Sequence, residues 1–242
     1  MKTIQVSESR LVSRTKTLVI FVFTIILGVI LFVAPNLFFG ITKFNGGLTG
    51  INLLIMGLFQ CITVCSLIHF SLRLLKKDFR YIGFSLSHWK RDGLLGLVGG
   101  LTWVTLQFVL IIPNTGGADR EDISQMVEMM DGSLIGMLSY IALGVIGGGI
   151  TEEIYSRGYF ITVLPDTFKN PKVGMYIATI LSILFFAALH LPSDSLGWFD
   201  ILVPTFMYTF LFLYTKRLVA PIVAHGIYNM TAIMLTYYTY YA

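Results

Sequence analysis

Charged residues are scarce in this sequence. Asp, Glu, Lys and Arg make up only 12% of its 242 residues, and 55% are hydrophobic, whereas a soluble domain carries about 25% charged residues. The long apolar runs exclude an ordinary soluble domain and indicate a polytopic membrane protein. We therefore expect an all-α transmembrane helix bundle with one membrane domain over residues 1–242, in the plasma membrane of a bacterium.

Other absences narrow the function. The sequence has no HExxH, the usual zinc-protease signature, and no basic stripe with interleaved aromatic residues that would indicate a nucleic-acid partner. It shows no internal repeat, which argues against a transporter built from two related halves. Its two cysteines, Cys61 and Cys65, lie one helical turn apart in an apolar run and are expected to be buried thiols. No small-x-small cleavage site follows the first apolar run, so that run is read as a retained helix.

Seven apolar runs are long enough to cross a bilayer as tilted helices. The fourth is too long for a simple span, and its glycines at 147–149 mark a place where it could bend. Pro165 is expected to end that helix. The expected spans are 17–39, 48–75, 93–112, 133–164, 173–190, 198–214 and 218–238.

The basic residues are distributed unevenly between the ends of these spans. Fifteen of the 17 lysines and arginines fall at the N-terminus or in the second, fourth and sixth connections, and only Lys43 and Arg120 fall on the other side. By the positive-inside rule the N-terminus is cytoplasmic and the C-terminus external. The third connection, 113–132, is then external and acidic.

Polar residues gather in the last four spans. The segment EEIYSR places Glu153 and Arg157 four residues apart on one helix face with the acid first, which favours an ion pair. Glu152 points about 100° away and has no obvious local partner, which suits a general base. The alternative is that both glutamates belong to one ion-pair network that braces two helices, although ionisable residues inside a membrane are usually functional.

Two further motifs carry histidine. In FFAALH, Phe186 lies one turn before His190 and is expected to pack against its ring, although a lone histidine at this place more often caps a helix. In HGIYN, His225 and Asn229 project into the same space and could donate hydrogen bonds to an oxyanion, or serve only as a packing contact between helices. The polar residues of the first three spans form no pattern: Asn52, Gln60, His69 and Gln107.

Together the three motifs resemble a known family. Their order, EExxxR, FxxxH and HxxxN on successive membrane helices, is similar to that of the CAAX-processing endopeptidase and bacteriocin-immunity (CPBP, or Abi) family of intramembrane proteases. The resemblance covers about residues 133–236, the expected catalytic core, and implies hydrolysis of a peptide bond within the membrane. It also implies a role for each residue: Glu152 and His190 activate a water, His225 and Asn229 stabilise the tetrahedral oxyanion, and Glu153, Arg157 and Phe186 support them.

Two mechanisms stay open at this point. The family is often described as metalloproteases, and zinc would take Glu152, His190 and His225 as ligands, with an open position for water. The nearest remaining carboxylate, Glu153, would then have to act as the base, although it is predicted to form an ion pair with Arg157. This conflict favours a metal-free glutamate mechanism.

The expected function is therefore an intramembrane endopeptidase that acts on hydrophobic peptides or membrane-protein tails, with a site open to the cytoplasmic side. The alternative is a non-catalytic immunity or scaffold protein that binds a bacteriocin or a cell-envelope partner. In this topology His190 lies at the outer end of its run, while Glu152 and His225 lie toward the cytoplasmic half. Tilted helices, a bend at the glycines, or a fifth helix that is broken or not fully spanning must therefore bring the three together.

Overall fold

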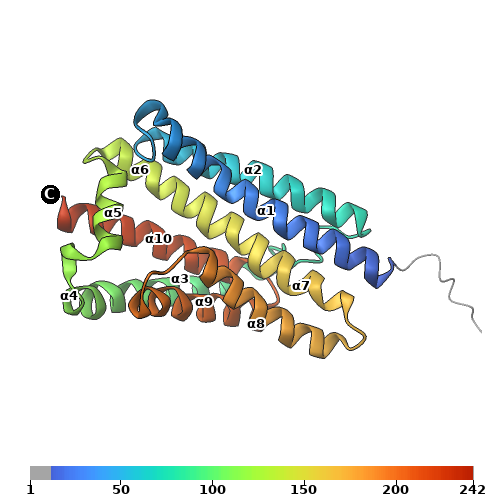
Figure 1. Cartoon of the computed structure of the whole chain (residues 1–242). Coiled ribbons are helices and arrows are strands. Elements are labelled where there is room, and N and C mark those ends of the chain that lie inside the picture. Colours follow the sequence, from blue (N-terminus) through green and yellow to red (C-terminus); the bar gives the residue numbers. More distant parts are fainter. Residues whose placement is uncertain (1–11, 242) are drawn as a thin grey trace, which may run out of the picture.

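The computed structural model describes residues 12–241, and every regular element within them is helical (Figure 1). The expected all-α bundle of seven spans is confirmed, and no end lies more than four residues from its expected position. Lys2 and Arg10, which entered the orientation argument, lie outside the described residues. The helices long and apolar enough to cross a membrane are Arg14–Thr42, Ile51–Leu74, Trp89–Asn114, Leu134–Thr167, Pro171–Leu189, Ser195–Thr215 and Val219–Tyr240.

Two of the spans are composite helices. The third runs from α3 through the π-helical segment Gln107–Ile111 into α4, and the fourth runs from α6 through the π-helical segments Leu143–Glu152 and Ile154–Phe160 into α7 and a final 3₁₀ turn, Leu164–Thr167. Short 3₁₀ turns also occur at Phe44–Gly46 and Gly117–Asp119. The α-helices are α1 Arg14–Thr42, α2 Ile51–Leu74, α3 Trp89–Leu106, α4 Ile112–Asn114, α5 Glu121–Met130, α6 Leu134–Ala142, α7 Ile161–Val163, α8 Pro171–Leu189, α9 Ser195–Thr215 and α10 Val219–Tyr240.

Local sequence signals explain where several helices begin. The Ser133 hydroxyl accepts a hydrogen bond from the Gly136 amide (2.9 Å) at the start of α6, and Asp194 accepts one from the Gly197 amide (2.7 Å) at the start of α9. Asn170 caps α8 in the same way, with Pro171 at its first helical position. Such residues satisfy amides that have no partner within the helix.

The last helix, α10, packs against α3, α9 and the segment Leu143–Glu152. A Cβ on Gly100 of α3 would lie only 2.5 Å from the Ala224 carbonyl oxygen of α10, so glycine is needed for this close approach. At the other end of α3, the buried carboxylate of Asp92 accepts hydrogen bonds from the Arg217 guanidinium (2.5 and 3.0 Å). These contacts fix α10 beside α3.

The outward surface of the bundle is apolar, as a bilayer requires. Large side chains such as Phe23, Ile62 and Phe210 are exposed, whereas Leu53, Val64 and Ile68 are buried between helices. The protein is therefore an integral membrane protein whose outward surface can contact lipid directly. One residue used in the orientation argument is placed differently from expectation: Arg157 lies buried within the fourth span, not in the connection that follows it.

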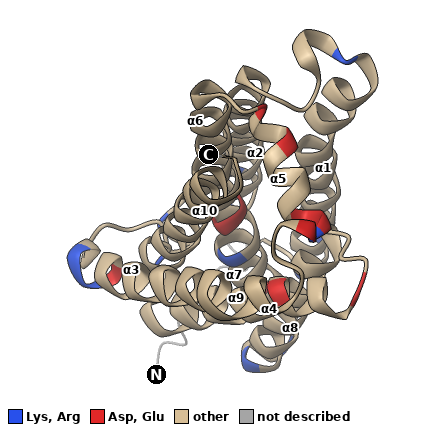
Figure 2. Ribbon diagram, turned by 90° about the vertical axis from the view of Figure 1, so that its left-hand side faces the viewer, with Lys and Arg blue, Asp and Glu red and all other residues tan. Residues whose placement is uncertain are grey.

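The two ends of the bundle differ. The end that carries α5 and the chain's C-terminus is seen end-on in Figure 2, where acidic segments gather on and beside α5. The opposite end carries the connections 75–88, 168–170 and 216–218, which hold six lysines and arginines. The third connection, expected only as an acidic loop, contains the amphipathic helix α5. The direction of the bundle in the membrane stays a prediction.

Candidate active site

Glu153 lies at the centre of the site, where it contacts two other side chains. Its Oε1 accepts a hydrogen bond from the Arg157 guanidinium (2.9 Å), and both side chains are fully buried. The predicted ion pair is therefore present. The same oxygen also lies 2.9 Å from Nδ1 of His225, 72 residues further along the chain. Sequence reasoning missed this second contact, because only the packing of α10 against the fourth span creates it.

The His225 ring is fixed from several sides. A carboxylate facing Nδ1 requires this nitrogen to carry a proton, so Nε2 is the ring nitrogen left for other partners. Tyr208 of α9 stacks on the ring, with centroids 4.7 Å apart and planes 17° apart, and Phe186 of α8 contacts its edge at 6.2 Å. No sequence pattern marks Tyr208, because it lies in an otherwise apolar run.

His190 follows the last residue of α8. Its Nδ1 lies 2.9 Å from the Phe186 carbonyl oxygen, and its ring packs on that of Phe186 with centroids 4.6 Å apart, as predicted. A carbonyl can only accept, so Nδ1 donates and the neutral ring presents Nε2 as an acceptor. The Phe186 ring also lies 4.2 Å from the Arg157 guanidinium carbon. One aromatic side chain thus contacts both candidate histidines and the buried cation.

Asn229 lies one turn after His225 and donates a hydrogen bond to the Gly144 carbonyl (2.8 Å). The fourth span passes close to it at Gly148, where a Cβ would lie 2.6 Å from the Asn229 amide nitrogen and 3.5 Å from His225 Nε2. The glycines at 147–149 continue the span with π-type winding. Their small size lets α10 bring its two polar side chains against this helix.

The four candidate catalytic residues line one cavity of about 250 Å³, so the structure brings them together as the three motifs require. They are Glu152, His190, His225 and Asn229. The fifth span, α8, has only 19 residues, or about 28 Å, and in Figure 1 it ends well short of the end that carries α5. Since α8 is still long and apolar enough to cross a membrane, the expectation of a broken or incomplete fifth helix stays a prediction. Glu152 lies near the middle of the 34-residue fourth span, not at its inner end.

Two spans that looked featureless also contribute. Asn36 of α1 and Gln60 of α2 line the same cavity, and the Gln60 amide donates to the Phe32 carbonyl (3.1 Å). The signal that could have found them is their polarity inside apolar spans, since such residues face the interior of a bundle. The site therefore includes residues from outside 133–236.

The side chains do not converge as metal ligands. Within residues 12–241, no group of three or more His, Cys, Asp and Glu side chains is placed to hold a metal ion. His225 directs Nδ1 to Glu153, and His190 directs Nδ1 to a backbone carbonyl. Each ring still has Nε2 open to another partner, and the proposed zinc ligands Glu152, His190 and His225 line one cavity without forming such a group.

The expected opening toward the cytoplasmic side stays a prediction, because the direction of the bundle in the membrane is itself a prediction. His190 also lines a larger cavity of about 440 Å³, whose other walls include Arg120, Asp122 and Asp194. Arg120 and Asp122 belong to the third connection, at the opposite end of the bundle from the basic connections. His190 is therefore a wall residue that the candidate site shares with a cavity at that end.

Comparison with protein families gives a match over the last four spans. Residues 134–231 match the family model for type II CAAX prenyl endopeptidases, described as Rce1-like. No curated protein and no solved structure matches the chain. The match confirms the resemblance predicted from the three motifs, all of which lie within the matched residues. It supports an enzyme of the CAAX-protease type that acts in the membrane.

Proposed function

We propose that this protein, which matches the CAAX-protease family over residues 134–231, is an intramembrane endopeptidase with Glu152 as its general base. The observation that carries the proposal is the single cavity lined by Glu152, His190, His225 and Asn229. These residues come from three helices and supply the group types that peptide hydrolysis needs: a base, a second proton acceptor and two hydrogen-bond donors.

The first step is attack by water. A water molecule between the Glu152 carboxylate and Nε2 of His190 gives its proton to Glu152, and its oxygen bonds to the carbonyl carbon of the substrate. Nε2 of His190 accepts the other hydrogen and orients the water, because Nδ1 is occupied by the Phe186 carbonyl. The carbonyl π bond opens and its oxygen becomes an oxyanion.

The second step is stabilisation and collapse of that oxyanion. The second N–H of the Asn229 amide is free to donate after the first has gone to Gly144. His225 donates from Nε2 as an imidazolium, and the adjacent Glu153 carboxylate stabilises its positive charge. The C–N bond then breaks, and the leaving amine takes the proton held by Glu152.

The substrate is a hydrophobic peptide or a membrane-protein segment. A separate cavity of about 230 Å³ beside Glu152 and His190 is lined by apolar residues of α1 and α8, namely Val29, Phe32, Val33 and Leu189. An apolar side chain or lipid group fits this lining. Nothing in the lining requires a prenyl group, and a bacterial plasma membrane suits such a substrate equally well.

The test is cleavage of apolar peptides by the full chain in liposomes, with Glu152→Gln as the inactive variant. This substitution keeps shape and removes the base, so turnover should fall about 10²–10⁴-fold while thermal stability stays near that of the parent. Glu128→Gln in α5 is the matched control, because it lines none of the cavities around the site. A cellular phenotype retained by Glu152→Gln at normal abundance would instead indicate an immunity or scaffold protein.

A further inference from the structure

A polar cavity adjoins the candidate site. We call it the outer cavity; its volume is about 440 Å³, and it lies between α5 and the start of α9. His190 lines both this cavity and the smaller one that holds Glu152, His225 and Asn229. His190 is therefore a wall residue common to the two cavities.

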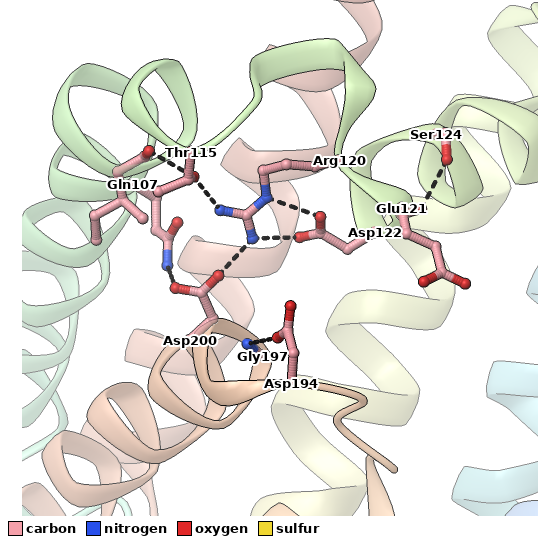
Figure 3. Close-up of polar contacts among 10 residues, drawn as sticks. Gln107, Thr115, Arg120, Glu121, Asp122, Ser124, Asp194, Gly197 and Asp200 are labelled. Carbon is pink, nitrogen blue, oxygen red and sulfur yellow. Dashed lines mark hydrogen bonds and ion pairs between the residues drawn. The ribbon is translucent and has the colours of Figure 1, made fainter.

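Hydrogen bonds from one arginine, Arg120, connect the residues that form the wall of the outer cavity. The Arg120 side chain is only 7% exposed and donates to Asp122 (2.9 and 2.8 Å), to Asp200 of α9 (2.5 Å) and to the Thr115 hydroxyl (2.9 Å) (Figure 3). Gln107 donates to the other oxygen of Asp200 (2.8 Å). Hydrogen bonding to Asp122 raises the pKa of Arg120 further, so the wall stays charged. A permanently charged wall suits hydrated peptide and not lipid chains.

The space on the other side of the reacting groups has the opposite character. The apolar cavity lined by Val29, Phe32 and Val33 of α1 also touches Glu152 and His190. Val33 and Leu189 are exposed on the lipid-facing surface, 42% and 41% respectively. His190 therefore lies between the outer cavity and this more apolar one, and of these two cavities Glu152 lines the apolar one only.

The outer cavity lies at the end of the bundle opposite the basic connections. Lysines and arginines outside the spans concentrate at the far end, in 76–80, at Lys169 and in 216–217. The end with α5 carries Lys43 and Arg120 together with the acidic residues of the third connection. By the positive-inside rule the outer cavity faces away from the cytoplasm.

We propose that substrates reach the site from the outer face, with their polar segment in the outer cavity and their apolar segment in the cavity beside α1. The substrate class is then a membrane-anchored peptide or protein whose scissile bond lies at the outer boundary of the bilayer. Cytoplasmic tails are excluded. This inference rests on the proposed protease function for its substrate class, but the direction of the cavity can be measured without any activity.

The first experiment measures that direction. In full-length protein with Cys61 and Cys65 replaced by alanine, Ser193→Cys places a thiol in the outer cavity, and Ser87→Cys is the matched serine control in the basic connection. A membrane-impermeant maleimide should label Ser193→Cys in intact cells, and Ser87→Cys only after permeabilisation. The reverse pattern overturns the proposal.

The second experiment uses two anchored substrates that carry one cleavable sequence at the outer or the inner end of the same apolar helix. Only the outer one should be cut, and a bulky maleimide on Ser193→Cys should lower its cleavage by up to about 10²-fold through misplacement of the substrate. Cleavage of the inner substrate alone overturns the route but leaves the protease function standing. If neither substrate is cut, the protease function and the substrate class both fail, while the labelling still decides the direction of the cavity.

Discussion

At the residue scale, Glu153 has more than the supporting role that its pairing with Arg157 suggests. It contacts the buried cation and a candidate oxyanion donor with the same oxygen. Glu153→Gln should therefore lose stability, since breaking a buried pair costs about 3–5 kcal/mol, and should also lower turnover per folded molecule. Arg157→Met should lose comparable stability with a smaller fall in turnover, because the contact between Glu153 and His225 remains.

The measurements are thermal unfolding in detergent and kcat corrected for the folded fraction. Equal turnover per folded molecule in Glu153→Gln and the parent would show that Glu153 has only an architectural role. Glu153→Asp is the rescue control, since it keeps the charge and shortens the reach to His225. Partial recovery of kcat with little recovery of stability would separate the two contacts.

The two candidate oxyanion donors should behave as a unit. Removal of one such donor typically costs about 10²–10³-fold in kcat, so His225→Ala and Asn229→Ala should each fall in this range. The double variant should lose less than the product of the single losses, because both donors serve one oxyanion. Independent, multiplicative losses in single-turnover cleavage would contradict a shared role.

Contacts within one helix were predictable from the sequence, and contacts between helices were not. The pairs of Glu153 with Arg157 and Phe186 with His190 follow from a spacing of four residues. The contact between Glu153 and His225 spans 72 residues, and that between Tyr208 and His225 depends on how α9 packs. Helical periodicity predicts on which face of its own helix a residue lies, but not which other helix packs against that face.

At the scale of elements, the approach of α3 to α10 depends on two glycines, Gly96 and Gly100. Gly100→Ala would place a methyl 2.5 Å from the Ala224 carbonyl oxygen, next to His225 in sequence, and should destabilise the protein by about 1–3 kcal/mol. Gly93→Ala is the matched control on the same helix, because no atom lies within 4 Å of the added methyl. It should be neutral or stabilising, since alanine is the better helix former.

Thermal unfolding of the two variants checks this prediction. Turnover should fall in Gly100→Ala as well, because displacement of α10 moves His225 and Asn229 away from the fourth span. Equal stability of the two alanine variants would show that the helices separate at little cost. Their packing would then contribute little to the placement of the site.

Hydropathy predicted the spans well but not their internal form. Seven runs and their ends followed from the width of a bilayer and the scarcity of charge. The π-type winding of the fourth span and the helix α5 within an acidic connection depend on tertiary packing.

At the scale of the whole molecule, the candidate site belongs to more of the chain than its motifs. The motifs lie in the last four spans, yet Asn36 and Gln60 line the same cavity, and Gln107 helps to hold Asp200 at the outer cavity. These residues come from the first three spans, which carry no recognisable pattern. They line cavities whose reacting groups come from the last four spans. The residues that line a cavity depend on its shape and follow no fixed spacing in the sequence.

The direction of the whole bundle is the last prediction. The basic residues outside the spans place the N-terminus inside and the C-terminus outside, and seven spans require the two termini to lie on opposite sides. A reporter active only outside the cytoplasm should therefore work when fused after Ala242, and its cytoplasmic counterpart should not. The control is the same pair of reporters fused after Ser87, where the result should be reversed. A cytoplasmic C-terminus with seven spans would turn the outer cavity inward, since both lie at one end of the bundle.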